Sequence, residues 1–441
     1  MVRIKNWFRA LNTHKSLILV LLLAVIVSVI FIELYENMKI WGDEPEYIMI
    51  SHEEANNQIS PVISLLPGYL SLQWWPPLPY SIYSFFANDR LQDHFAKKNI
   101  LDDEHFLTNK RRFLKDVAYL QLLLLVVSGV LIYLISITMS LSPSFSSLAV
   151  ALTIFNPRVL FYIQTLWPEL IHYVLLLSAI FFFISYLKKN SLVLLLISSV
   201  LFIYCVFTKL IVSYYFFLLI VVLIYYHRNT LKQKRTINAL CLFIIPFFLL
   251  STIQKTKNYY EFNAFAISTN SWINIERGII PNHIMDGSSI GEGYRAVSND
   301  PIERERKSRE RVIEYVLKSS KIEDFVSHQV GQFFDQLGSS FLQRGVRRNR
   351  WSRSNALDLA VSFSTFLSWF LFILGSVGAF LYSRKNIIIF SVAIFVIYYL
   401  ASLFLVLYIP RYFVPVIPPL AIFTSMVIRD LIIASRKDPV I

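Results

Sequence analysis

Two adjacent carboxylates, Asp43 and Glu44, follow the first long apolar segment of the chain. Pro45 suits the first position of a helix, so we expect Glu44 to be the N-cap, and the N–H groups of that helix would keep both carboxylates ionised and oriented. An oriented, ionised carboxylate can act as a general base toward a hydroxyl. Tyr47 adds a polar group on the same helix. An acidic helix cap in a solvated loop is the alternative interpretation of this stretch.

A second Pro-Glu pair, Pro168 and Glu169, begins a later apolar segment. His172 lies three residues after Glu169, so the two side chains share one face of the expected helix. As a metal site this pair is incomplete, and a structural or hydrogen-bonded pair is the simpler interpretation. Glu169 is nevertheless a candidate binding residue because carboxylates are rare so close to a membrane span.

Two single cations stand at the ends of apolar segments. Lys209 interrupts apolar sequence, which makes it a candidate for phosphate binding, with a lysine that reaches back to the membrane surface as the alternative. Arg411 and Tyr412 precede the last apolar segment, and Pro415 follows closely. This arginine is either a second phosphate ligand or an anchor for the helix end.

A dense basic run precedes the third segment from the C-terminus. Its members are Arg344, Arg347, Arg348, Arg350 and Arg353. Arginine binds phosphate oxygens through a planar fork, so Arg347 and Arg348 are candidates for holding a lipid-linked phosphate. Contact with anionic headgroups is the alternative.

The composition indicates a polytopic membrane protein. Hydrophobic residues make up 55% of the 441 residues and charged residues 16%, so a soluble domain would lack a polar surface. The net charge of +13 fits cytoplasmic loops and anionic lipid. Basic and aromatic residues do not interleave, which argues against nucleic acid as a partner. The two cysteines fall in apolar runs and imply no disulfide framework.

The apolar pattern predicts an all-α protein with about ten transmembrane helices. The expected spans are residues 17–35, 118–138, 145–163, 168–187, 191–208, 210–226, 237–253, 357–381, 387–408 and 412–432. Basic connectors then fall on the side of the N-terminus, as the positive-inside rule requires. They are Lys188 with Lys189, Arg228 with Lys232, Lys234 and Arg235, Arg384 with Lys385, and Arg436 with Lys437.

This topology predicts that both termini are cytoplasmic and that the first span is a retained signal anchor. An N-terminal membrane module, residues 1–253, would contain a first outer loop at 36–117. A second outer region at 254–356 would precede the C-terminal helices, 357–441. Both loops are expected to carry interfacial helices: an aromatic and proline-rich stretch at 74–80, and an amphipathic helix from about Pro301 to Leu337.

All of the chemical candidates fall on the outer side of this topology. A carboxylate beside several cations at a bilayer favours transfer of a group from a lipid phosphate. The cations would hold the leaving phosphate while the carboxylate activates a hydroxyl.

In order along the chain, these motifs resemble the GT-C superfamily of polyprenyl-phosphate-sugar glycosyltransferases. The nearest branch is that of the family 39 protein mannosyltransferases and the bacterial enzymes that add aminoarabinose to lipid A. The residues that carry the resemblance are Asp43-Glu44 with Tyr47, Pro76-Pro77-Leu78, Pro168-Glu169, Lys209, Asn258-Tyr259 with Thr269-Asn270, and Arg411-Tyr412 with Pro415 and Pro418. The resemblance runs from about residue 17 to 432.

The resemblance implies an inverting glycosyltransferase in the cell (inner) membrane, with its active site on the extracytoplasmic face. Asp43 would be the catalytic base with Glu44 beside it, and Lys209 and Arg411 would contact the donor phosphate or sugar. The other implied donor-site residues are Tyr47, Glu169, Asn270, Arg347, Arg348 and Tyr412. The implied partners are a polyprenyl-phosphate-sugar donor, membrane lipid, and a glycan, lipid or protein acceptor. No cofactor is expected, and a divalent metal is used by other GT-C enzymes but is not required in this branch.

The sequence departs from the family pattern in two places. Glu169 stands where several relatives have Asp, and the region around Trp272 lacks an expected glycine pair, which leaves the sugar undefined. Two other functions stay open. A lipid or glycan flippase would line a path with embedded charges, although no internal repeat is visible. A surface-polysaccharide polymerase or ligase would use outer arginines such as those of the 344–353 run.

Overall fold

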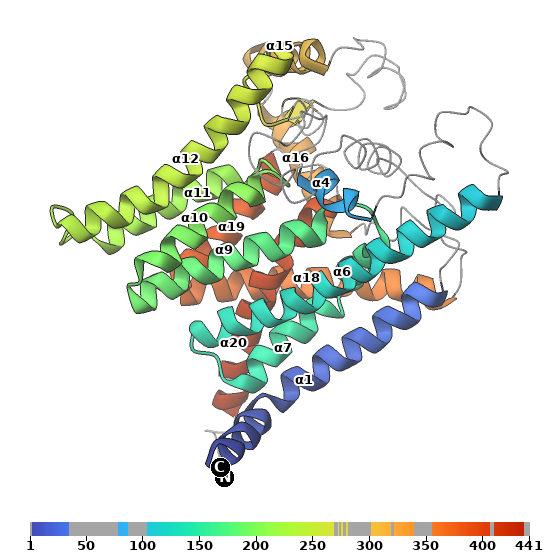
Figure 1. The fold of residues 1–441 in the computed structure, drawn as a ribbon, viewed down its shortest axis with the longest axis vertical. Helices are drawn as coiled ribbons and strands as arrows, with labels where there is room; N and C mark the ends of the chain where they lie inside the picture. The colour runs from blue at the N-terminus through green and yellow to red at the C-terminus, as the bar shows by residue number, and fades with distance from the viewer. Residues whose placement is uncertain are drawn as a thin grey trace.

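The computed structural model describes residues 2–34, 78–86, 104–268, 272, 275–276, 279–280, 301–318, 322–338, 355–405 and 410–435. Within these ranges every element is a helix (Figure 1). The elements are α1 (Val2–Leu34), α4 (Leu78–Ser84), α6 (Glu104–Thr138), α7 (Pro143–Ile154), α8 (Pro157–Leu160), the 3₁₀ helix η3 (Phe161–Gln164), α9 (Glu169–Lys189), α10 (Leu192–Val206), α11 (Val212–Tyr226), α12 (Lys234–Phe262), α15 (Pro301–Lys318), α16 (Ile322–Gly338), α18 (Asn355–Tyr382), α19 (Ile387–Leu405), the 3₁₀ helix η4 (Pro410–Val416) and α20 (Ile417–Ser435). The predicted all-α membrane fold is confirmed.

The chain is a multi-pass membrane protein in which the ten predicted segments are helical but differ in length. Seven helices of the described chain are long and apolar enough to span a bilayer: α1, α6, α9, α12, α18, α19 and α20. α7 together with the following α8 and η3 passes the same test, but the two parts are bent by 60°, which makes them either a broken span or a re-entrant loop. The remaining two, α10 and α11, have 15 residues each, about 22 Å against a hydrocarbon core of roughly 30 Å.

The bend after α7 has a local cause. Pro157 has no backbone N–H to continue α7, and Asn156 begins a new helix by accepting the N–H of Arg158 on its side chain at 3.0 Å. Residues 157–164 therefore turn away from the direction of α7 by 60° before α9 begins at Glu169.

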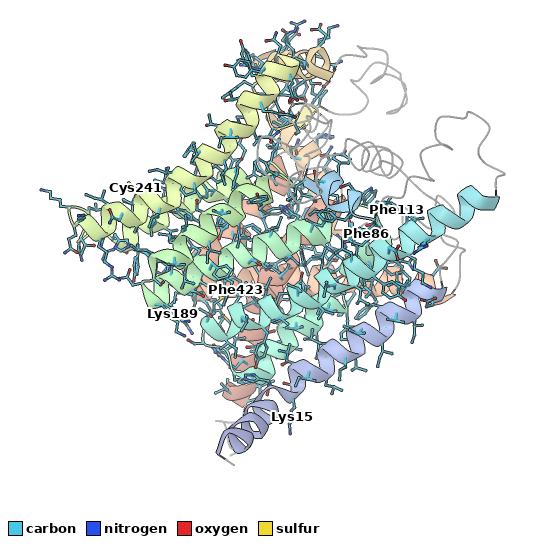
Figure 2. The ribbon with its side chains drawn as sticks, in the orientation of Figure 1. Lys15, Phe86, Phe113, Lys189, Cys241 and Phe423 are labelled. Atoms are coloured by element: carbon cyan, nitrogen blue, oxygen red, sulfur yellow. The ribbon has the colours of Figure 1, made fainter. Side chains whose placement is uncertain are left out.

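The helix ends divide into two groups, as the predicted topology requires. Figure 2 shows Lys15, Lys189 and Cys241 toward one end of the helices, and Phe86 and Phe113 toward the other. The start of α1 and the end of α20 lie at the same end of the bundle (Figure 1). The assignment of that end to the cytoplasm stays a prediction.

The second outer region differs from its prediction in one respect. The single amphipathic helix expected at 301–337 is two helices, α15 and α16. The sequence places Ser319 and Ser320 between them, and serine favours helix caps over helix interiors. The helical period of the apolar residues continues through both helices, which is why the pattern alone suggested one element.

Close backbone approach joins α18 to α20. A Cβ atom placed on Gly378 would lie 2.7 Å from the carbonyl oxygen of Phe423, and one on Gly375 would lie 2.8 Å from that of Leu420. Small residues allow such close packing between membrane helices, where van der Waals contact and not hydrophobic burial drives association. These two glycines thereby set the position of α20, and with it that of η4.

Replacing Gly378 by Ala is expected to destabilise the protein by about 1–3 kcal/mol, because the backbone of α20 must shift to admit the methyl group. Thermal unfolding of the detergent-solubilised protein measures the effect. Gly331→Ala is the control, since a Cβ there meets nothing within 4 Å. An unchanged melting temperature for Gly378→Ala would contradict the packing described.

Candidate active site

A buried ion pair joins α9 to the turn between α10 and α11. The ammonium of Lys209 donates to Oε1 of Glu169 at 2.9 Å. The Lys209 side chain is 10% exposed and that of Glu169 is 1% exposed. Removing two charges from water offsets much of their attraction, so a buried pair is weak evidence for a purely stabilising role. The pair is therefore the centre of the candidate site.

Helix geometry explains how residues 40 apart in the sequence meet. Asn190 ends α9 in the left-handed conformation, at φ 52°, and α10 returns antiparallel beside α9. Glu169 stands in the first turn of α9, where the helix dipole favours a carboxylate. At the far end of α10, the N–H of Lys209 bonds to the carbonyl of Cys205 at 3.0 Å. The α9–α10 hairpin thus brings its two outermost charged residues together.

His172 supports the same turn from α9. Its Nδ1 lies 2.7 Å from the hydroxyl oxygen of Thr208, and that hydroxyl donates to the carbonyl of Cys205 at 2.6 Å. All three residues are buried. The predicted pairing of Glu169 with His172 is replaced by two separate contacts from one helix face: Glu169 binds Lys209, and His172 binds Thr208.

The described part of the predicted first outer loop, α4, is hydrogen-bonded to the backbone just before each of the two residues of the ion pair. The N–H of Leu78 donates to the carbonyl of Phe207 at 3.1 Å, two residues before Lys209. The hydroxyl of Tyr83 donates to the carbonyl of Trp167 at 3.3 Å, two residues before Glu169. The prediction that this loop belongs on the same side as Glu169 and Lys209 therefore agrees with the structure.

The described part of the aromatic and proline-rich stretch is buried in the protein. Tyr80 of this stretch and Tyr83 of the same helix are both fully buried. Gln121 of α6 donates to the hydroxyl of Tyr83 at 2.8 Å. Aromatic side chains with a polar tip suit a polar protein interior as well as a headgroup layer.

The start of the last span reaches the same end of α9. Tyr173, four residues after Glu169, donates its hydroxyl to the carbonyl of Val414 at 2.8 Å. Val414 belongs to η4, whose backbone includes Arg411 and Tyr412. The structure therefore brings the backbone of η4 to α9, and the role of Arg411 stays a prediction.

Arg158 is a buried cation that the sequence analysis did not select. It is 3% exposed, lies over the ring of Phe413 at 5.4 Å and donates to the carbonyl of Leu337 at 2.6 Å. It therefore connects α8 with η4 and with the end of α16. An arginine inside the apolar run 145–163 was a usable signal, because charges at membrane depth are rare and functional.

Several predicted site residues lie outside the described residues. They are Asp43, Glu44, Tyr47, Asn270, Arg347 and Arg348. Their roles stay predictions. In the described part of the chain, no three His, Cys, Asp or Glu side chains gather as metal ligands, and the expectation about metal stays a prediction as well.

The fold has a solved counterpart. The crystal structure of the apo oligosaccharyltransferase from Archaeoglobus fulgidus superposes with a TM-score of 0.52 at 12% sequence identity, covering 95% of this chain and 51% of that one. That protein belongs to the GT-C superfamily. The chain has the GT-C fold. The resemblance inferred from the ordered motifs is thus confirmed at the level of the fold.

Other structures match with lower scores. The AglB oligosaccharyltransferase from Archaeoglobus fulgidus, in complex with an inhibitory peptide and a dolichol-phosphate, has a TM-score of 0.49 at 11% identity and covers 97% of this chain and 52% of that one. ArnT from Cupriavidus metallidurans bound to undecaprenyl phosphate has a TM-score of 0.34 at 14% identity, covering 98% and 81%. The chain described here spans about half the length of the oligosaccharyltransferases. Neither the family models nor the curated proteins give a match to the sequence.

Removing one partner of the ion pair is expected to destabilise the protein more than removing both. Glu169→Gln or Lys209→Met leaves an uncompensated buried charge, which costs about 3–5 kcal/mol, whereas the double variant has no net buried charge to solvate. Melting temperatures of the four proteins in one detergent test this. A double variant less stable than either single one would show that the pair is not coupled as the 2.9 Å contact implies.

Proposed function

We propose that this protein is an integral membrane glycosyltransferase. It transfers a sugar from a polyprenyl-phosphate donor to a hydroxyl of a glycolipid, polysaccharide or protein acceptor on the extracytoplasmic face. The observation that carries this proposal is the buried Glu169–Lys209 pair at the end of the bundle where the first outer loop packs. The GT-C fold supports it, because the oligosaccharyltransferase that shares this fold is itself named for a glycosyl transfer.

The depth of the pair suits a lipid-linked phosphate. The two 15-residue helices that flank Lys209 are about 8 Å shorter than the hydrocarbon core. If their cytoplasmic ends start at the membrane surface, the turn that carries Lys209 lies below the outer surface. The phosphate of a polyprenyl lipid is tethered to chains in the hydrocarbon core, so a cation at this depth meets the phosphate without pulling the lipid out of the membrane.

In this proposal Lys209 contacts the donor phosphate while it keeps its hydrogen bond to Glu169. An ammonium has three donors, and the hydrogen bond to Glu169 orients the side chain. Arg411 on η4 would supply the second positive charge, since the Glu169–Lys209 pair has no net charge of its own. A phosphate dianion held by these two cations is a better leaving group, because its developing charge is stabilised in a site that excludes water.

Asp43 completes the reaction in this proposal. Its carboxylate takes the proton of the acceptor hydroxyl as that oxygen attacks the anomeric carbon, and the bond from that carbon to the phosphate oxygen breaks. Polyprenyl phosphate leaves from the opposite side, so the configuration at the anomeric carbon inverts. Glu44 caps the helix and orients the base.

Asp43→Asn is expected to lower sugar transfer by about 10²–10⁴-fold, because the general base is lost while the shape of the side chain is kept. Membrane vesicles assayed with a panel of radiolabelled polyprenyl-phosphate sugars measure this at equal protein level. Glu46→Gln, three residues away on the same stretch, is the matched control and should keep most of the activity. Near-normal transfer by Asp43→Asn would remove Asp43 as the base.

The outer position of residues 254–356 has a direct test. A cysteine introduced at Ser352 is expected to react with a membrane-impermeant maleimide in intact cells, in a background where Cys205 and Cys241 are replaced by Ser. A cysteine introduced at Asn229, in the connector with Arg228 and Lys232, should react only after permeabilisation. The reverse pattern would invert the orientation and place the site in the cytoplasm.

A further inference from the structure

His172 has a second ring nitrogen to which no described residue of the protein is bonded. The imidazole is fully buried, and its Nδ1 faces Thr208. Within the described residues, Nε2 has no hydrogen-bond partner. A buried polar atom without a partner is destabilising and requires an explanation.

The hydrogen bonds determine which nitrogen carries the proton. A threonine hydroxyl has one hydrogen to donate, and Thr208 donates it to the carbonyl of Cys205 at 2.6 Å. The contact of 2.7 Å between Nδ1 and the same hydroxyl oxygen must then be a bond donated by Nδ1–H. In a neutral imidazole the other nitrogen carries a lone pair, so Nε2 of His172 is an acceptor.

The thiol of Cys205 does not change this assignment. Its sulfur lies 3.4 Å from Nδ1 and 3.9 Å from the carbonyl of His172, so it too contacts the Nδ1 side of the residue. The ring is consequently held on one edge by α10 and by the turn that follows it. This fixed tautomer presents the lone pair of Nε2 on the opposite edge.

The chemistry of Nε2 restricts what it can bind. An acceptor lone pair repels phosphate oxygens, which are acceptors themselves, and a buried apolar setting disfavours a cationic donor. A neutral hydroxyl group can donate a hydrogen bond to the lone pair and brings no charge into this setting. His172 lies one helical turn after Glu169, and its Nδ1 contacts Thr208, which precedes Lys209. A hydroxyl bound at Nε2 would therefore lie in the neighbourhood of the ion pair.

We propose that Nε2 of His172 accepts a hydrogen bond from a hydroxyl group of the donor sugar. Lys209 then recognises the phosphate of the donor and His172 recognises its sugar, from adjacent turns of the same hairpin. This inference rests on the proposed function. It assigns to this site a recognition of sugar hydroxyls that is separate from the recognition of lipid phosphate.

Two substitutions of His172 test the two ring nitrogens separately. His172→Asn keeps an N–H donor close to the position of Nδ1 and removes the acceptor at Nε2. His172→Gln places an amide near Nε2, where its oxygen can accept, and removes the donor to Thr208. Binding is measured in nanodiscs with undecaprenyl phosphate and with the undecaprenyl-phosphate sugar that gives the highest transfer, in the Asp43→Asn background so that the donor is not consumed.

We expect His172→Asn to weaken binding of the sugar-bearing lipid by about tenfold or more, while the affinity for undecaprenyl phosphate is unchanged. His172→Gln should keep most of the affinity for both lipids. Equal binding of the sugar-bearing lipid by His172→Asn and by the unsubstituted protein overturns the inference. Equal weakening of both lipids overturns it too, since that result marks a residue that only holds the fold.

A different result would refute the proposed function. If the protein with His172 intact binds neither lipid, the polyprenyl-phosphate donor is wrong, and the role of His172 falls with it. If it binds both lipids equally well with and without the Nε2 acceptor, the donor class stands and only the sugar contact is refuted.

Discussion

The rest of the structure depends on one constraint, which is that charges buried at membrane depth must be paired. Lys209 and Glu169 satisfy it through a 2.9 Å contact, and the two helices that carry them must stay in register for that contact to exist. The hairpin of α9 and α10 supplies the register, with Asn190 at the closed end and Thr208 bound to His172 at the open end. A slip of α10 along α9 by one turn would shift the two charges by about 5 Å relative to each other, so that neither would compensate the other.

Two further segments meet at the open end of this hairpin. The first outer loop binds it through Leu78 and Tyr83, and the entrance to the last span binds it through Val414. Each of these contacts ends on a backbone carbonyl, so side-chain identity at the accepting residue is not what holds them. Segments from the predicted first outer loop, the fourth predicted span and the last predicted span therefore meet around a single pair of charges. This is the location of the proposed phosphate site.

The sequence predicted much of this and misjudged some of it for identifiable reasons. The length of the apolar runs predicted helices at all ten segments, but α10 and α11 are shorter than a full span. The turn between them is itself rich in apolar residues, so the apolar pattern does not show where each helix ends. Glu169 and Lys209 were both selected as rare charges in apolar surroundings, yet their pairing was not. His172 was predicted to pair with Glu169, because the spacing of residues along one helix indicates only which of them share a face.

The sequence by itself determined the class of the protein, the helices and the candidate charges, because these follow from hydropathy, helix period and the rarity of charge near a membrane. Only the tertiary structure decided that Lys209 pairs with Glu169, that Tyr80 and Tyr83 are buried in the protein, and that Arg158 joins η4 to α16. Partners far apart in the chain are set by packing, which local pattern does not encode. The adjacent carboxylates Asp43 and Glu44 remain sequence-based candidates for catalysis.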